Sequence, residues 1–238
     1  FRVPCLIVPI FARLSRISLF YLKKACPAKY CCRYFSFFRY LGEFGVERHR
    51  RYLFLILAAQ YLVVYFHRVS PAVLAQDLAA SFGISATALG VLASAYFYPY
   101  AAMQVPVGIL SDSWGPKKTI VLCSLIAALG AIAFGLAPCF SVAVGARSLV
   151  GLGLAAVFVS SMKIFGLWFR GAELARVAGA LMAVGGIGWY CATTPLALLS
   201  EVFGWRSAVV IVGVLSLGVI FLIWRFVEDS PEKKGLPP

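Results

Sequence analysis

The sequence predicts an all-α membrane protein built from six transmembrane helices. Hydrophobic residues make up 62% of its 238 residues, charged residues make up 13%, and the mean hydropathy is +0.90. A soluble domain has about 45–50% apolar and roughly 25% charged residues. A membrane span needs about 20 apolar residues, and six runs close to that length follow residue 51. Because these runs do not alternate between apolar and polar residues, they indicate helices rather than barrel strands.

The first 50 residues form a basic, aromatic-rich extension in which charged residues leave no apolar run of spanning length. The first methionine of the chain is Met103. We therefore expect residues 1–50 to be either an artefact of upstream translation or a disordered segment; if genuine, it would lie on anionic lipid headgroups. Residues 51–230 are predicted to form the six-helix domain, and residues 231–238 to begin a cytoplasmic linker.

The six predicted spans are separated by short connectors that contain most of the charged residues. The spans cover residues 52–76, 87–110, 119–136, 140–164, 178–200 and 207–224. Residues 77–86 are expected to form a polar turn after the first span, and Pro138 separates the third span from the fourth.

Basic residues gather in the connectors of one side of the predicted bundle. That side receives Arg48, Arg50, Arg51, Lys117, Lys118, Arg170, Arg176, Arg225, Lys233 and Lys234. The other side receives Asp77, Glu201 and Arg206. Because cytoplasmic loops carry an excess of Lys and Arg, this distribution predicts a multi-pass protein of the cell's inner or plasma membrane with a cytoplasmic N-terminus. It also accounts for most of the net charge of +13, so a nucleic-acid partner is not expected.

The sequence GILSDSWGPKKTI joins the second and third spans. Gly108 is expected to let the second span approach a neighbouring helix, and Gly115 to adopt a positive φ in a tight turn. Asp112 is expected to cap a helix N-terminus or to pair with a cation of a cytoplasmic connector. Lys117 and Lys118 would anchor the turn to lipid headgroups.

This loop resembles the signature between the second and third helices of the major facilitator superfamily of secondary transporters. The sequences RSLVGLGLA, LWFRGAELARVAG and FGWRSAVVIVGV resemble further motifs of that family, and together the resemblance covers residues 51–231. It implies the amino-terminal six-helix half of a twelve-helix carrier. The loop departs from the family pattern at Ser113 and Pro116, where basic residues are usual, which leaves the partner of Asp112 open.

Arg68, in the first span, is the main candidate for substrate binding. A charged side chain at the centre of a span costs at least about 2.5–3.5 kcal/mol, so it normally faces a cavity or a partner. Tyr61 and Tyr65 precede it by seven and three residues and fall on the same helix face. A guanidinium and tyrosine hydroxyls are suited to bind a carboxylate or phosphate. The sequence VYFHRVSPAVL also resembles the first span of the anion transporters in the superfamily, which implies substrate contact by the Tyr and the Arg. Alternatively, Arg68 extends outward to the membrane surface.

Three more residues are candidates, each with two open roles. Arg147 in the fourth span either faces the same anion, since the predicted spans contain no Asp or Glu, or holds backbone carbonyls. His67 has two candidate roles. An unperturbed histidine pKa of about 6.5 suits a proton relay, and the alternative is a hydrogen-bonded structural residue. Tyr190 in the fifth span lines the substrate cavity or packs against helices.

The sequence therefore predicts secondary active transport of a small organic anion, such as a carboxylate or sugar acid, together with a proton or another ion. A carboxyl-terminal six-helix half or a second chain would complete the substrate site. The alternative is a non-transporting half-size protein: a sensor, a scaffold or an inactive truncated product. An enzyme is not expected, because no cluster at the span ends pairs a nucleophile with a base. No cofactor or metal is expected either, since the seven cysteines lack the paired spacing of metal sites.

Overall fold

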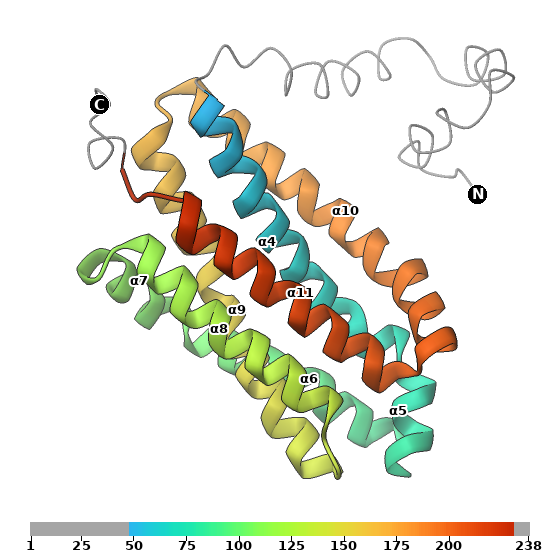
Figure 1. The fold of residues 1–238 in the computed structure, drawn as a ribbon. Helices are drawn as coiled ribbons and strands as arrows, with labels where there is room; N and C mark the ends of the chain where they lie inside the picture. Colours follow the sequence, from blue (N-terminus) through green and yellow to red (C-terminus); the bar gives the residue numbers. More distant parts are fainter. Residues whose placement is uncertain (1–47, 231–238) are drawn as a thin grey trace, which may run out of the picture. The chain divides into compact units, whose positions relative to one another are not determined.

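The computed structural model describes residues 48–230, which form a bundle of helices without a described strand (Figure 1). The helices are α4 (Arg48–Val73), α5 (Ala75–Phe82), α6 (Ala86–Ala102), α7 (Gln104–Ser113), α8 (Pro116–Gly135), α9 (Phe140–Trp168), α10 (Ala172–Phe203) and α11 (Trp205–Phe226). Residues 1–47 of the predicted extension (1–50) and the predicted linker after residue 230 lie outside the described residues, whereas residues 48–50 belong to the start of α4.

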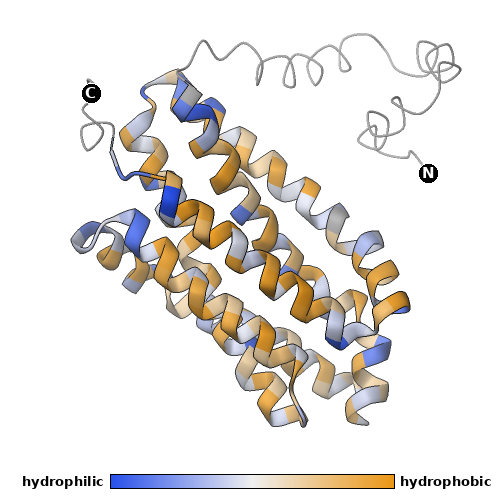
Figure 2. Ribbon diagram, in the orientation of Figure 1, coloured by the Kyte–Doolittle hydropathy of each residue, from blue (hydrophilic) through white to orange (hydrophobic). Residues whose placement is uncertain are grey.

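Five helices in this part of the chain, α4, α8, α9, α10 and α11, are each long and apolar enough to cross a membrane. Most of their residues are hydrophobic along the length of each helix, as the hydropathy colouring of the ribbon shows (Figure 2). Helices α5 and α6 pass the same test only as one bent pair, and α6, which has 17 residues, continues into α7. Residues 48–230 thus confirm the predicted all-α fold, with five candidate membrane helices, or six when that bent pair is counted.

The junction between α6 and α7 is a local interruption of one helix. Backbone hydrogen bonds run through it, from Met103 N to Pro99 O at 3.0 Å and from Val107 N to Met103 O at 2.9 Å. Pro106 lacks the N–H group that would bond the carbonyl of Ala102, which accounts for the interruption. By contrast, α5 and α6 meet at an angle of 114°, so α5 does not continue the span.

Helix α5 corrects the predicted polar turn at residues 77–86. Leu78 is fully buried against the bundle, while Asp77 is exposed and accepts a hydrogen bond from Ser200 Oγ at 2.6 Å. The helix ends at Gly83, whose φ of 61° is accessible to glycine without strain. An eight-residue helix with one deeply buried position gives too little periodicity to be recognised from sequence.

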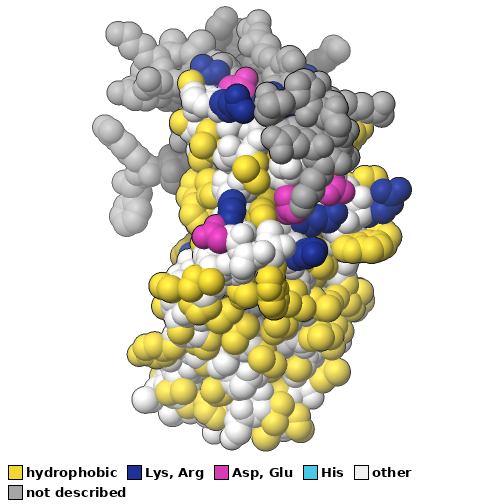
Figure 3. Space-filling view, turned by 90° about the vertical axis from the view of Figure 1, so that its left-hand side faces the viewer, with side chains coloured by type: hydrophobic (Ala, Val, Ile, Leu, Met, Phe, Trp, Pro, Cys, Tyr) yellow, Lys and Arg dark blue, Asp and Glu magenta, His cyan; other side chains and the backbone are white. Residues whose placement is uncertain are grey.

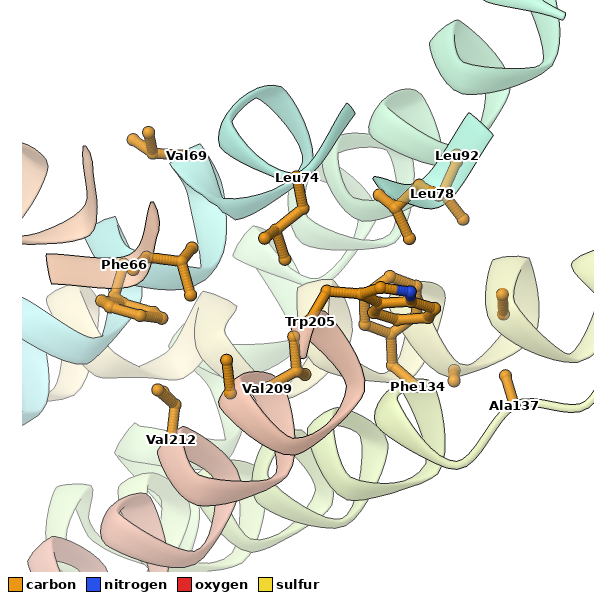
Figure 4. Close-up of a cluster of buried hydrophobic side chains, with 14 of the residues drawn as sticks. Phe66, Val69, Leu74, Leu78, Leu92, Phe134, Ala137, Trp205, Val209 and Val212 are labelled. Carbon is orange, nitrogen blue, oxygen red and sulfur yellow. The ribbon is translucent and has the colours of Figure 1, made fainter. Parts of the chain in front are cut away.

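A hydrophobic cluster lies where α4, α5, α6, α8, α9, α10 and α11 meet (Figure 4). The Trp205 ring lies 5.8 Å from the Phe134 ring and 5.7 Å from the Phe82 ring, measured between centroids. Its indole N–H donates to Ser81 Oγ at 2.8 Å. One aromatic side chain thereby ties the start of α11 to α5 and to the end of α8.

Helix α9 makes its closest approaches through glycines. A Cβ atom at Gly151 would lie 2.0 Å from the backbone oxygen of Tyr96 in α6. A Cβ atom at Gly153 would lie 2.3 Å from the backbone oxygen of Cys123 in α8. Because both obstacles are backbone atoms, no side-chain movement relieves them, and the helix separations on both sides of α9 depend on glycine.

The end of the bundle at which α4 begins and α9 ends, called here the charged end, is held together by polar contacts. Arg50 of α4 pairs with Glu173 of α10 at 3.1 Å, and Trp168 Nε1 donates to the backbone oxygen of Glu228 at 3.0 Å. Figure 3 shows Lys, Arg, Asp and Glu gathered toward this end, above a mostly hydrophobic surface. The basic connectors thus share one end, as predicted; that this end faces the cytoplasm stays a prediction.

Asp229, beyond the end of α11, caps the distant helix α8. Its Oδ1 accepts a hydrogen bond from the backbone N–H of Lys117 at 2.7 Å, in the first turn of α8. The four N–H groups of a helix's first turn lack partners in their own helix, and a carboxylate there also interacts favourably with the helix dipole. The carboxylate therefore closes the bundle at a point 112 residues away in sequence.

Replacing Asp229 with alanine is expected to destabilise the bundle by about 1 kcal/mol, the usual effect of losing an N-terminal cap. The measurement is the thermal unfolding midpoint of the purified chain in detergent micelles. The matched control is Glu228→Gln, which removes only the half-exposed ion pair between Glu228 and Lys117 at 3.2 Å and is expected to have a smaller effect. A larger loss in the control than in Asp229→Ala would contradict the capping role.

Candidate substrate site and loop motif

Arg68 lies near the end of α4 that is remote from the charged end, with its side chain half-buried among aromatic rings. Its Cζ atom is 5.3 Å from the ring centroid of Tyr65, 5.3 Å from that of Tyr100 and 5.9 Å from that of Phe97. Its Nε is buried without a hydrogen-bond partner, and within residues 48–230 no carboxylate forms a salt bridge with it. Ring faces attract a cation, and the N–H of Nε is left without a hydrogen-bond acceptor.

The two tyrosines predicted to accompany Arg68 do lie together. The hydroxyls of Tyr61 and Tyr65 are 3.4 Å apart, and their rings meet edge to face at a centroid distance of 5.2 Å. They pack against α10 at Gly185, where a Cβ atom would come within 2.5 Å of the Tyr65 ring and 2.8 Å of the Tyr61 ring. The small residues of α10 therefore make room for these aromatic side chains.

The aromatic residues that α6 contributes were not among the predicted site residues. Tyr96 is fully buried, and its ring stacks on that of Tyr100 at 5.7 Å, whereas Tyr98 is 77% exposed. Residues four apart share a helix face, so this spacing was the available signal for grouping Tyr96 with Tyr100. The sequence alone did not tell which face of α6 turns toward α4.

Arg147, in α9, is deeply buried and contacts the backbone of α4. Arg147 is only 1% exposed, and its Nη2 donates a hydrogen bond to the backbone oxygen of His67 at 3.0 Å. Nη1 donates to Ser70 Oγ at 3.4 Å. The sequence left two roles open for Arg147, and the structure shows the hydrogen bond to a backbone carbonyl that one of them requires. Substrate contact by Arg147 stays a prediction.

His67 and Tyr190 differ in their surroundings. His67 is 3% exposed and its ring lies 6.1 Å from that of Phe66. Tyr190 is 48% exposed on α10, and its ring is not among those that surround Arg68. The structure therefore places His67 next to the site but does not bring Tyr190 to Arg68. Proton coupling by His67 and substrate contact by Tyr190 stay predictions.

Near the end of α7, Asp112 forms a salt bridge with Lys163 of α9. Lys163 Nζ also donates to the backbone oxygen of Ser111 at 2.7 Å. Of the two predicted roles of Asp112, pairing with a cation is the one observed, although its partner lies in the last turns of a span rather than in a connector. Lys163 was missed because the sequence does not show which face of α9 meets α7.

The remaining loop residues follow the prediction in part. Gly115 has a φ of 94°, as predicted. Lys117 pairs with Glu228 at 3.2 Å, and Lys118 is exposed. The predicted close approach at Gly108 is wrong within the described bundle, because a Cβ atom there would meet nothing within 4 Å. Gly108 lies on a face of α7 that no described helix covers so closely.

No group of three or more His, Cys, Asp or Glu side chains within residues 48–230 is arranged to hold a metal ion. The chemistry available around Arg68 is thus that of one guanidinium, phenol hydroxyls and aromatic faces. Such a set is suited to hold an anion through charge and hydrogen bonds.

The sequence model of the Major Facilitator Superfamily matches residues 53–238 of the chain. The chain belongs to the major facilitator superfamily. The bundle is also similar to a solved member of that fold, a bacterial homologue of the human lysosomal transporter Spinster in an inward-facing and occupied conformation. The TM-score is 0.70 at 23% sequence identity, over 79% of this chain and 46% of that one. At this identity the likeness supports the fold alone.

Two curated relatives from the superfamily are named as transporters of acids. The chain is 30% identical over 178 residues to a probable sulfoacetate transporter, SauU, of Cupriavidus necator, covering 75% of this chain and 41% of the relative. It is 26% identical over 190 residues to a D-galactonate transporter of Escherichia coli, covering 79% of this chain and 44% of the relative. The chain thus spans less than half the length of these relatives.

Proposed function

We propose that this chain supplies the amino-terminal six helices of a secondary carrier for small organic anions, with Arg68 as the group that binds the anion. The observation that carries the proposal is the half-buried guanidinium of Arg68, held by three aromatic rings with its Nε unpaired. A cation within a span requires a counter-charge or access to water. An anionic substrate would supply that charge each time it binds.

Tyr61 and Tyr65 support the same assignment. They lie on the same face of α4 as Arg68, and their hydroxyls can donate hydrogen bonds to a carboxylate. The two relatives are named as transporters of sulfoacetate and of D-galactonate, which agrees with an anionic substrate. These names and the family favour a carrier over the non-transporting alternative. Transport would proceed by alternating access, with a second six-helix part closing the substrate site.

We also propose that the charged end faces the cytoplasm, because its connectors hold most of the Lys and Arg residues. The carrier would then lie in the cell membrane with a cytoplasmic N-terminus. His67, buried one residue before Arg68, is the candidate for coupling anion uptake to a proton.

The test is an uptake panel in proteoliposomes that contain the chain together with any sequence that continues it. Radiolabelled galactonate, glucuronate and sulfoacetate are compared with neutral galactose and cationic choline, with and without a pH gradient. We expect saturable uptake of at least one acid, competition by other acids and none by galactose. Faster uptake toward the more alkaline side would support proton coupling. Uptake of galactose or choline but of no acid would contradict the proposal.

A further inference from the structure

Pro71 opens a gap in the backbone hydrogen bonds of α4, directly beside Arg68. It lies inside this helix, and proline has no N–H to donate to the carbonyl four residues earlier. That carbonyl belongs to His67. Within a membrane span, where water is scarce, an unpaired carbonyl is costly and is normally satisfied by a neighbouring group.

Two side chains fill this gap. The hydroxyl of Ser70 donates to the backbone oxygen of His67 at 3.1 Å, and Nη2 of Arg147 donates to the same oxygen at 3.0 Å. Nη1 of Arg147 donates to Ser70 Oγ at 3.4 Å, which links the two donors. The carbonyl freed by Pro71 is therefore paired by a guanidinium from another helix.

Arg147 is held firmly enough to act as a fixed support. Its Cζ atom lies 5.4 Å from the ring centroid of Tyr96 and 5.5 Å from that of Phe134. One turn further along α9, Gly151 lies against the backbone oxygen of Tyr96, so α9 and α6 are closely packed here. No carboxylate within residues 48–230 forms a salt bridge with Arg147, and Arg147 is only 1% exposed.

We propose that Arg147 is a positioning residue whose guanidinium replaces the backbone hydrogen bond removed by Pro71 and thereby sets the direction of the Arg68 side chain. Arg68 is joined by one peptide bond to the carbonyl that Arg147 holds. Loss of the Arg147 contact lets α4 bend at Pro71, which turns Arg68 within its aromatic surroundings. The consequence for substrate rests on the proposed function, whereas the replaced hydrogen bond does not.

The test is a double-mutant cycle of Arg147→Met, Pro71→Ala and the pair combined. Alanine at position 71 restores the N–H donor for the His67 carbonyl, so it makes the guanidinium dispensable. The readouts are the unfolding midpoint in detergent, and KM and kcat for uptake of whichever acid the panel identifies. We expect Arg147→Met to lower the midpoint and raise KM about tenfold or more, the size of a lost hydrogen bond to a charged group, with a smaller change in kcat.

In the double variant we expect both the midpoint and KM to return most of the way to those of Pro71→Ala, because residues in one hydrogen-bond network are non-additive. Additive losses without recovery would overturn the proposal. Recovery of the midpoint without recovery of KM would also overturn it, since Arg147 would then contact the anion directly.

A third variant covers the case in which Arg147→Met does not accumulate in the membrane. Arg147→Lys retains the charge and one donor direction but not the planar fork. We expect it to be partly impaired and to be rescued by Pro71→Ala in both readouts, and absence of rescue would count against the proposal. If the unaltered protein takes up no acid at all, the proposed function fails, while the unfolding midpoints still decide whether Arg147 replaces the missing hydrogen bond.

Discussion

We expect the replacement of Arg68 with alanine to abolish the proposed uptake of organic acids, while the protein still accumulates in the membrane. The alanine variant loses two charge-assisted hydrogen bonds to the anion, worth about 3 kcal/mol or more together, which corresponds to roughly a hundredfold or greater loss of apparent affinity. The substitution also removes the cation from its ring contacts with Tyr65, Phe97 and Tyr100 and leaves these surroundings uncharged. The fold survives, because a half-buried charge is replaced by a small apolar group.

Lysine at position 68 gives a second, finer expectation for the same site. It keeps the positive charge but presents a compact ammonium in place of the planar fork that engages a carboxylate with two hydrogen bonds. We expect an increase in KM of about tenfold, intermediate between the unaltered protein and Arg68→Ala.

Initial uptake rates over a range of acid concentrations measure both substitutions, with membrane abundance determined in parallel. Arg170→Lys is the matched control, because Arg170 is exposed in the connector between α9 and α10 and should leave uptake unchanged. Retention of the original KM and rate in Arg68→Ala would show that the anion is bound elsewhere, or that Arg68 extends to the membrane surface as the alternative interpretation holds.

Substituting alanine for Gly151 should destabilise the bundle strongly, although it adds only one methyl group. The added carbon would sit 2.0 Å from the backbone oxygen of Tyr96, so α6 and α9 must separate. Overpacking of this kind typically lowers the free energy of unfolding by about 1–3 kcal/mol and occasionally more. We expect a loss at the upper end of this range, because the obstacle is a backbone atom, which cannot move aside by changing a side-chain rotamer. Separation of these helices would also displace Tyr96 from Arg147, whose Cζ lies 5.4 Å from its ring centroid.

The same helix provides a control with the same chemical change. A Cβ atom at Gly145 would meet nothing within 4 Å, and alanine favours helix over glycine by up to about 1 kcal/mol. Gly145→Ala should therefore leave the unfolding midpoint in detergent unchanged or raise it, whereas Gly151→Ala should lower it and reduce membrane accumulation. Equal midpoints for the two variants would refute the close packing of α6 on α9.

The candidate membrane helices could be predicted from sequence because each depends on a local property, an apolar run between charged connectors. The grouping of Tyr61, Tyr65 and Arg68 could be predicted for the same reason, since spacing along one helix determines which side chains share a face. The positive φ of Gly115 likewise follows from a local requirement of the turn.

The partners across helices could not be predicted in this way. In a soluble helix the apolar face identifies the inside, but a span is apolar on all sides, so its pattern does not reveal which face meets which neighbour. The pairing of Asp112 with Lys163 and the orientation of Tyr96 toward Arg147 both depend on such rotations. Pro71 marks a missing hydrogen bond in the sequence itself, yet only the packing of α9 on α4 shows which side chain replaces it.

The attachment of Asp229 to the start of α8 has a mechanical consequence. The chain leaving α11 is fastened at two points, through Asp229 to the backbone N–H of Lys117 and through the Glu228 carbonyl to the indole of Trp168. A displacement of Glu228 or Asp229 would therefore act on α8 and α9 as well as on α11.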